Sequence, residues 1–286
     1  MISDNVAFIQ NKNRNLSKAE MTNLEIKIFS MRFLFVLLLQ AIILISFAQL
    51  QPITYGAYHW NALPVKKDKQ RETRKIAEGT TNEFAYFEIH ATTQYKGAIP
   101  RPPHMQDSIE ELIIVKEGTL ACSIGNKSAI LGKGSVLLIP PKEMMTFENA
   151  GDGPVTYYVL MFRSKKSMNM ERSKLAGGTM LINYDSLTYK EVNSRGTRKY
   201  FDRPTAMCEK YEMHTTHLKE KGPSHAPHQH VDTEIILMID GNSEMMIEGK
   251  TFSAGPGDLY IIESGKFHGI SNAADSPCNY FAFKWK

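Results

Sequence analysis

The stretch GPSHAPHQHVDTEIILMIDG, residues 222–241, decides the fold. It carries His228, His230 and Glu234 between its two terminal glycines. Side chains on a strand alternate between the two faces, so His228 and His230 point to the same side. Glu234 has the same parity and shares that side if the strand continues without a bulge. A single strand histidine would be an ordinary core or surface residue, but two imidazoles and a carboxylate in phase predict a metal site that needs one more ligand.

Composition and charge describe an ordinary globular protein. The 286 residues are enough for one large domain or two ordinary ones. Charged residues make up 22% of the chain and hydrophobic residues 42%. The net charge is only +4, and the Lys and Arg residues are scattered. A nucleic-acid-binding protein needs a clustered basic face, so we expect no nucleic-acid partner.

An apolar segment precedes the part of the chain that is expected to fold. Residues 33–48, FLFVLLLQAIILISFA, follow Arg32 directly. The segment is shorter than the ~20 residues that span a bilayer comfortably. Ser46 and Ala48 are small residues at the spacing that signal peptidase reads. We therefore predict that residues 1–48 are a signal peptide with an upstream extension, and that the protein is exported to the periplasm or secreted without a membrane span after cleavage.

The cysteines leave two alternatives open. The chain has three cysteines, at positions 122, 208 and 278, and their spacing does not repeat. An exported protein can keep disulfides, so Cys208 and Cys278 could pair. Buried free thiols are an equally good interpretation.

Short strand patterns fill the chain from Glu83 onward. Segments such as FAYFEIHATT, ELIIVKEG and SVLLIPP are rich in β-branched and aromatic residues, and Gly, Pro and Asn separate them. Regularly spaced short strands predict an all-β barrel or sandwich. Residues 164–182 break this pattern because they are polar and basic and include a pair of glycines. They are expected to form a linker.

The second half of the chain repeats the first. Arg71, Arg74 and Lys75 recur as Arg195, Arg198 and Lys199, an offset of 124 residues. After a slip of one residue, Gly118 and Asn149 recur as Gly241 and Asn272. So many identities at a nearly constant offset predict two copies of one domain. The predicted domains are residues 49–163 and 183–286. The histidines and acidic residues that repeat are Glu88 with Glu212, His90 with His214, His104 with His228, and Glu111 with Glu234.

The second copy resembles a cupin. The first cupin motif is matched at every spacing by Gly222, His228, His230, Glu234 and Gly241. The second motif is matched by Gly257, Gly265, His268 and Asn272, with Glu263 where proline is usual. The resemblance implies two tandem double-stranded β-helix barrels of jelly-roll order. It also implies that His228, His230, Glu234 and His268 are metal ligands.

A set of three imidazoles and one carboxylate suits a divalent transition metal ion. We favour Fe²⁺ or Mn²⁺, because four ligands of this kind can leave coordination positions open; Zn²⁺, Ni²⁺ and Cu²⁺ are the other candidates. The strand pattern agrees with the fourth ligand, because His268 opens the short segment GISN after a turn at Gly265. This segment can lie across from the first motif.

The first copy departs from the pattern at the predicted ligands. His104 and Glu111 remain, but Gln106 stands at the second histidine and Met145 at the last. This set suits no common divalent ion. We therefore predict one metal per chain, in the C-terminal barrel only. The N-terminal barrel is expected to be a supporting one; the alternative is that its pocket binds an organic ligand.

Nearby histidines are assigned no catalytic role. His225 lies in a loop and is expected to face solvent. His214 and Glu212 are expected to be structural, because His90 and Glu88 occupy the same places in the copy without the metal set.

The function that follows is a mononuclear metalloenzyme acting on a small, oxygen-rich organic substrate. The resemblance allows a dioxygenase, a decarboxylase, or an isomerase or lyase. The alternative is a non-catalytic ligand-binding or storage protein with a structural metal. The catalytic residues and the substrate are not assigned, because many chemistries occur on this fold. The resemblance also implies that a homodimer could form.

Overall fold

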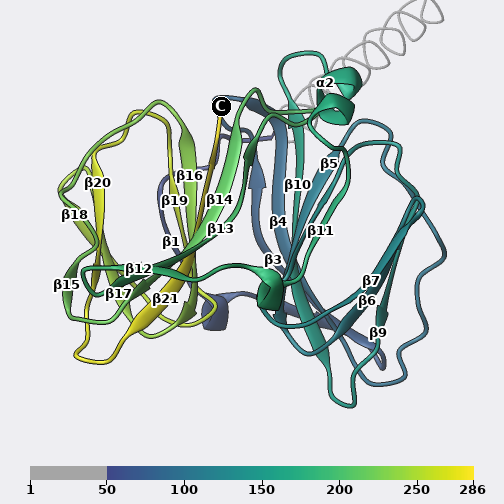
Figure 1. Ribbon diagram of the computed structural model, residues 1–286, viewed down its shortest axis with the longest axis horizontal. Helices are drawn as coiled ribbons and strands as arrows, with labels where there is room; N and C mark the ends of the chain where they lie inside the picture. Colours follow the sequence, from purple (N-terminus) through teal and green to yellow (C-terminus); the bar gives the residue numbers. More distant parts are fainter. Residues whose placement is uncertain (1–49) are drawn as a thin grey trace, which may run out of the picture. The chain divides into compact units, whose positions relative to one another are not determined.

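The computed structural model describes residues 50–286. The predicted signal peptide lies outside these residues and stays a prediction. Strands dominate the described part, and they form antiparallel sheets in jelly-roll order (Figure 1). The prediction of an all-β fold with two tandem barrels is confirmed. None of the helices among residues 50–286 is long and apolar enough to span a membrane.

The N-terminal barrel consists of a large and a small antiparallel sheet. The large sheet has the order β11-β8-β5-β10-β4-β3-β2, and the small sheet has the order β7-β6-β9, with strand bounds as follows. These are β2 (Val65–Lys67), β3 (Arg71–Gly79), β4 (Phe84–Gln94), β5 (Glu110–Glu117), β6 (Leu120–Ile124), β7 (Lys127–Leu131), β8 (Val136–Ile139), β9 (Met145–Asn149), β10 (Val155–Ser164) and β11 (Met180–Ile182).

The C-terminal barrel repeats this arrangement. Its large sheet has the order β1-β19-β16-β21-β14-β13-β12, and its small sheet has the order β15-β20-β17-β18. The strands are β1 (Gly56–Tyr58), β12 (Lys190–Val192), β13 (Arg195–Arg203), β14 (Tyr211–Leu218), β15 (Gly222–Pro223), β16 (Thr233–Asp240), β17 (Ser243–Ile247), β18 (Lys250–Ala254), β19 (Leu259–Ile262), β20 (His268–Asn272) and β21 (Cys278–Trp285). Between β10 and β11 lies the short helix α2 (Met170–Leu175).

The two large sheets exchange their edge strands. Strand β1, which precedes the N-terminal barrel in sequence, pairs with β19 of the C-terminal barrel. Strand β11, which precedes the C-terminal barrel, pairs with β8 of the N-terminal barrel. These two strands are themselves equivalent at the offset of 124 residues, because Gly56 corresponds to Met180. Each barrel is therefore completed by a segment that precedes the other one.

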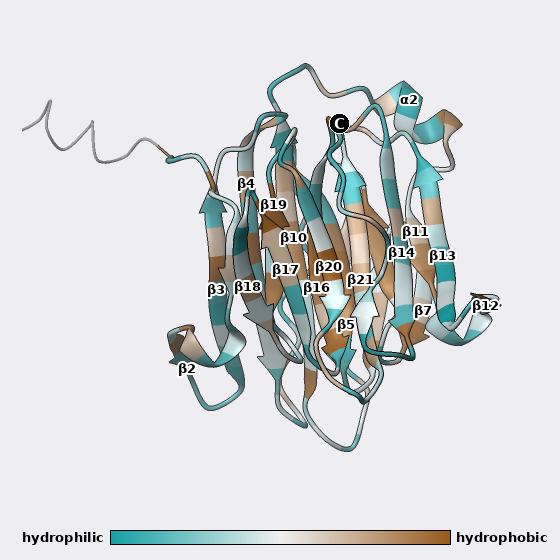
Figure 2. Ribbon diagram, turned by 90° about the vertical axis from the view of Figure 1, so that its left-hand side faces the viewer, coloured by the Kyte–Doolittle hydropathy of each residue, from teal (hydrophilic) through white to brown (hydrophobic). Residues whose placement is uncertain are grey.

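Alternating side chains on the large sheets pack into separate cores. On β16, Ile236 and Met238 face the interior of the C-terminal barrel. Ile235 and Leu237 face the opposite way and join a core shared by both barrels. Because both faces are covered, the strand reads as a continuous apolar run rather than an alternating one. Figure 2 shows the apolar colouring on strands such as β19 and β10, while the loops are mainly hydrophilic.

The cysteines are buried free thiols. Cys208 belongs to the core between the barrels, and Cys278 belongs to the interior of the C-terminal barrel. Because the two thiols lie in different cores, the alternative of a Cys208–Cys278 bridge does not hold in this structure.

Candidate metal centre

The segment with the first two histidines is a loop, not a strand. Strand β16 begins only at Thr233, and a bend at residues 231–232 separates it from His230. The expectation of one continuous strand from His228 to Glu234 is therefore wrong. Proline at position 227 has no N–H to donate, so regular strand pairing cannot extend back through this position.

This loop is held against β20. The backbone N–H of His228 donates to the carbonyl of His268 at 2.9 Å, and the N–H of His268 donates to the carbonyl of His228 at 2.8 Å. A Cβ at position 269 would lie 3.0 Å from Pro227 Cγ, so Gly269 lets the loop approach the strand closely. The backbone thus fixes two of the histidines opposite each other.

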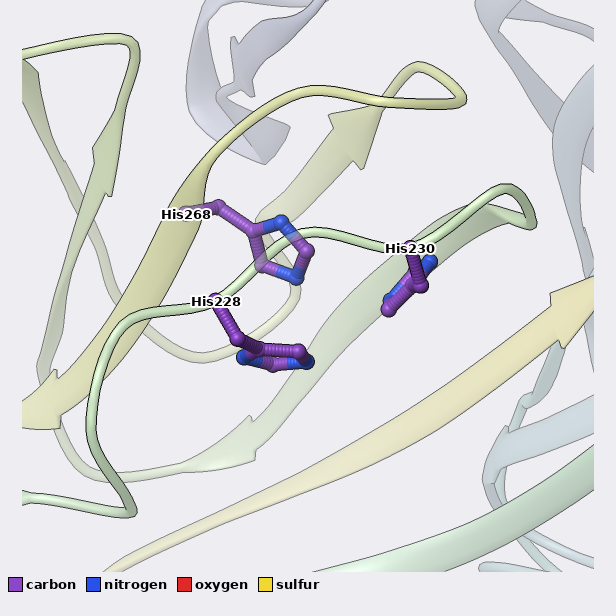
Figure 3. Close-up of side chains that lie close together, drawn as sticks. All are labelled: His228, His230 and His268. Carbon is purple, nitrogen blue, oxygen red and sulfur yellow. The ribbon is translucent and has the colours of Figure 1, made fainter.

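The structure brings His228, His230 and His268 together. One side-chain nitrogen from each lies within 4.8 Å of the others. The ring centroids are 5.3 Å apart for His228 and His230, 4.7 Å for His228 and His268, and 5.0 Å for His230 and His268. Figure 3 shows the three rings gathered around one space. From the start of β16, Glu234 places its Oε2 atom 3.1 Å from the Nε2 atoms of both His230 and His268.

The hydrogen bonds of the rings suit a cation at this point. His230 Nδ1 lies 2.9 Å from the carbonyl oxygen of Asp232, and His268 Nδ1 lies 2.8 Å from that of Lys266. A carbonyl only accepts, so both Nδ1 atoms carry hydrogen, and in the neutral rings both Nε2 atoms present lone pairs. These lone pairs face a carboxylate oxygen. Such a group of acceptors requires a positive charge among them, either a metal ion or additional ring protons, so the donor set fits a divalent transition metal ion.

Protonation in the metal-free protein follows the same geometry. Burial by itself raises the pKa of Glu234, but hydrogen bonds from His230 and His268 outweigh it and hold this pKa well below 4.5. Burial lowers the pKa of His268, but the bond to Glu234 and the carbonyl of Lys266 outweigh it and raise this pKa above 6.5. Burial, together with the neighbouring histidines, lowers the pKa of His228. The carboxylate is therefore ionised and ready to bind a cation at neutral pH.

These shifts predict how metal affinity depends on pH. Metal binding needs neutral imidazoles, so protons compete with the ion. His268, whose pKa is raised above 6.5, takes up its proton at a higher pH than His228, whose pKa is lowered. Calorimetric metal titrations should show affinity that is constant at higher pH and falls by at least about tenfold from pH ~7.5 to ~5.5. A metal affinity that does not change over this pH range would contradict the assignment of these histidines as metal ligands.

A cavity adjoins the histidines inside the barrel. It has a volume of about 180 Å³ and is lined by residues from several strands and the histidine loop. The register explains the lining, because Thr216 pairs with Tyr280, His214 with Ala282, and Glu212 with Lys284, and these pairs share the inner face. The lining residues include Arg195, His214, Thr216, His225, His228, Glu234, Ile236, His268, Tyr280 and Lys284.

Two basic side chains, Arg195 and Lys284, line the cavity. Lys284 Nζ lies 3.3 Å from Glu212 Oε1, which partly neutralises it. Arg195 lines the same cavity, and no residue among 50–286 forms an ion pair with it. Burial lowers the pKa of His214, so this ring adds no charge at neutral pH. An unpaired guanidinium beside a metal site is suited to bind an anionic group.

Two weaker expectations concern residues beside this cavity. His225 is an exposed loop residue, as expected, and it also lines the cavity, with its ring centroid 4.6 Å from that of His228. His214 also lines the cavity, and Glu212 holds Lys284 there. The sequence did not predict that Arg195, Tyr280 and Lys284 line the cavity beside the histidines. The repeat contained a signal for Arg195, since Arg71 matches it, but no motif marks the other two.

The equivalent place in the N-terminal barrel has different chemistry. His104 and Met145 form the same backbone bridge as His228 and His268, so Met145 occupies the position of the last histidine. Gln106 and Glu111 line a cavity beside them. Within residues 50–286, the cluster of three metal-ligating side chains lies in the C-terminal barrel.

Comparisons with known proteins agree with the architecture. The family model described as "Cupin domain" matches residues 92–161 and again residues 214–283. No curated protein sequence matches the chain. The structure of protein Ylba from E. coli is 14% identical, with a TM-score of 0.63 and coverage of 82% of this chain and 91% of that one. AerE from Microcystis aeruginosa is 13% identical, with a TM-score of 0.62 and coverage of 81% and 99%.

A third solved structure is the oxalate decarboxylase of Lactobacillus farciminis in complex with formate. It is 11% identical, with a TM-score of 0.62 and coverage of 82% of this chain and 87% of that one. At such identities the likeness concerns the fold alone, and the chemistry has to be argued from the site.

Proposed function

The chain is a member of the cupin superfamily with two cupin domains, and we propose that its C-terminal barrel is a mononuclear metal-dependent enzyme for a small, oxygen-rich organic acid. The observation that carries this proposal is that two features lie next to each other. Three histidines and Glu234 converge on one point, and the cavity beside them contains the unpaired Arg195. A metal ligand set alone would serve a structural role equally well, but an unpaired guanidinium in the cavity next to it favours a bound anion.

His228, His230, Glu234 and His268 would hold the ion. When bound, a divalent metal supplies Lewis acidity toward substrate oxygens or a binding place for O₂. We propose Fe²⁺ or Mn²⁺, because this donor set is hard enough for either and leaves coordination positions free. One solved structure similar to this chain was described in work on the Mn(II) centres of Bacillus subtilis oxalate decarboxylase, which supports Mn²⁺ as a candidate.

The other residues of the cavity position the substrate. The Arg195 guanidinium can accept a carboxylate in a two-point contact, which orients the rest of the molecule toward the histidines. Lys284 lies between two carboxylates, since it pairs in register with both Glu212 and Glu234. The cavity volume of about 180 Å³ is below the range of drug-sized pockets, which limits the substrate to a few carbon atoms.

The test is turnover by the metal-loaded protein. Separate samples loaded with Fe²⁺ or Mn²⁺ would be incubated with small hydroxy, keto and dicarboxylic acids, while O₂ consumption, CO₂ release and substrate loss are recorded. O₂ uptake would assign oxidation, and CO₂ release without it would assign decarboxylation. Substrate loss without either would assign isomerisation or lysis. Tight binding of an acid without any turnover would contradict the enzyme and support the binding or storage alternative.

Arg195 gives a sharper prediction for the substrate that is found. Arg195→Met should raise KM by at least about tenfold, because one charge-assisted contact to the carboxylate is lost. Its metal content should equal that of the wild type, since Arg195 is not a ligand. Steady-state kinetics with metal analysis of the same sample checks both.

Arg198→Met is the matched control. Arg198 lies on the same strand, but its guanidinium carbon packs 4.6 Å from the ring centroid of Tyr184, away from the cavity. The control should leave KM unchanged. If both variants behaved alike, or if Arg195→Met kept the wild-type KM, Arg195 would not be the carboxylate contact.

A further inference from the structure

The N-terminal barrel keeps a cavity where the C-terminal barrel has its metal centre. This cavity has a volume of about 280 Å³, larger than its counterpart. Its polar lining includes His90, Gln94, Arg101, Gln106, Glu111 and Tyr157. His90 and Gln94 are four residues apart on β4, about 13 Å along a strand, so the cavity is elongated. A barrel that only supported its neighbour would be expected to fill such a space with apolar side chains.

Gln94 is buried with an unsatisfied oxygen. The residue is 3% exposed, and its Nε2 donates to the hydroxyl of Tyr157 at 2.9 Å. Its Oε1 atom has no hydrogen-bond partner among residues 50–286. Buried amide oxygens are nearly always paired, so this atom indicates a missing donor. The C-terminal barrel has Leu218 at the equivalent position, so the polar group belongs to this cavity alone.

Glu111 places a carboxylate in the same cavity. The residue is 4% exposed, and burial raises its pKa even though Gln106, His104 and His90 act in the opposite direction. No residue of the described chain forms an ion pair with it. His90, which could do so, is held by Glu88, with its Nδ1 atom 2.8 Å from Glu88 Oε1. A cationic group brought in by a ligand would therefore be stabilised at Glu111.

Arg101 supplies the opposite charge. It lines the cavity three residues before His104, where the C-terminal barrel has His225. Arg101 is exposed, and no ion pair or hydrogen bond involves its guanidinium within residues 50–286. An exposed, free guanidinium beside a cavity can bind a carboxylate with two parallel hydrogen bonds.

From these three groups we propose that the N-terminal barrel binds a free amino acid, without metal. The ligand's ammonium group lies at Glu111, its carboxylate is bound by Arg101, and a donor at the far end of its side chain reaches Gln94. The cavity offers one unpaired negative and one unpaired positive charge, which is the complement of a zwitterion. Gln106 and Met145, which replace two histidines of the other barrel, do not form a ligand set for a common divalent ion.

The test is binding of amino acids to the full-length protein. The twenty standard amino acids would be screened by ligand-observed NMR, and those that bind would be titrated by calorimetry. We expect at least one to bind with one site per chain and a Kd below about 1 mM. The matching hydroxy acid, which lacks the amine, and the matching amine, which lacks the carboxylate, should each bind at least about tenfold more weakly.

Variants test whether the amino acid binds in the N-terminal barrel. Glu111→Gln, Gln94→Leu and Arg101→His should each weaken binding by at least about tenfold. The last two introduce the residue that the C-terminal barrel has, and Arg101 is exposed, so its variant does not endanger folding. His230→Ala should leave amino acid binding unchanged, which separates this site from the proposed metal enzyme.

Several results would overturn the proposal. These are no binding of any amino acid at about 10 mM, equal binding of the hydroxy acid, wild-type binding by Arg101→His, or loss of binding in His230→Ala. The last result would mean that the amino acid chelates the metal of the C-terminal barrel.

Discussion

Replacing His230 by alanine should release the metal ion from the C-terminal barrel and abolish metal-dependent turnover. His230 contributes one of three imidazoles, and its Nε2 atom lies 3.1 Å from the carboxylate that completes the set. Losing even an outer-shell partner of a ligand typically costs 10–100-fold in affinity, so losing a ligand should cost at least about 100-fold. Metal analysis after dialysis should show about one ion per chain in the wild type and near zero in the variant.

Two other histidine variants serve as controls. His225→Ala removes a ring from the same loop, and His104→Ala removes the equivalent of His228 from the N-terminal barrel. Both proteins should keep about one ion per chain, because neither residue belongs to the predicted set. If His230→Ala kept its metal while His104→Ala lost it, the ion would be bound in the N-terminal barrel and the central proposal would be wrong.

Of the substitutions proposed for this protein, Trp285→Ala should cause the largest loss in the free energy of unfolding. Trp285 is 1% exposed and belongs to the core shared by the two barrels. Its ring centroid lies 5.3 Å from those of Phe84 and Phe87, and 5.9 Å from that of Tyr211. Phe84 and Phe87 come from the N-terminal barrel, so one side chain joins both halves. Truncating a buried aromatic residue costs about 3–5 kcal/mol of unfolding free energy, and the gap left here cannot collapse without moving two sheets.

Urea denaturation followed by circular dichroism would measure this loss. The midpoint should fall markedly for Trp285→Ala, whereas Leu175→Ala, in the helix α2 and 81% exposed, should change the free energy of unfolding by less than about 0.5 kcal/mol. A loss below about 1 kcal/mol for Trp285→Ala would show that the shared core does not stabilise the pair of barrels.

Much of the fold could be predicted from sequence because two signals were independent. The recurrence of residues at an offset of 124 indicated the duplication, and the histidine spacing indicated the kind of barrel. The exchange of β1 and β11 could not be predicted. Each is three residues long, so it carries no periodicity, and β1 pairs with a strand about 200 residues away. Short edge strands are placed by tertiary packing, which local sequence does not encode.

The candidate site, like the fold, could be predicted from the sequence only in part. The spacing of His228, His230 and Glu234 was informative even though the assumed continuous strand was wrong, because a bend and a bridge to β20 bring the same side chains together. The cavity lining was not predictable. Arg195 and Lys284 are 89 residues apart in the sequence, and they line the same cavity only because β13 and β21 both pair with β14 in the large sheet. Which charges remain unpaired depends on that packing.

The exchanged edge strands also constrain the order in which the chain can fold during synthesis. Strand β11 ends at Ile182, so the N-terminal barrel can complete its large sheet as soon as that residue has emerged from the ribosome. Strand β1 has to wait for β19 at Leu259–Ile262. At a synthesis rate of about 5–20 residues per second, that delay is roughly 10–40 seconds, during which β1, the first strand of residues 50–286, lacks the strand that it pairs with. Its brevity is an advantage in this interval, since three residues offer little edge for pairing with another nascent chain.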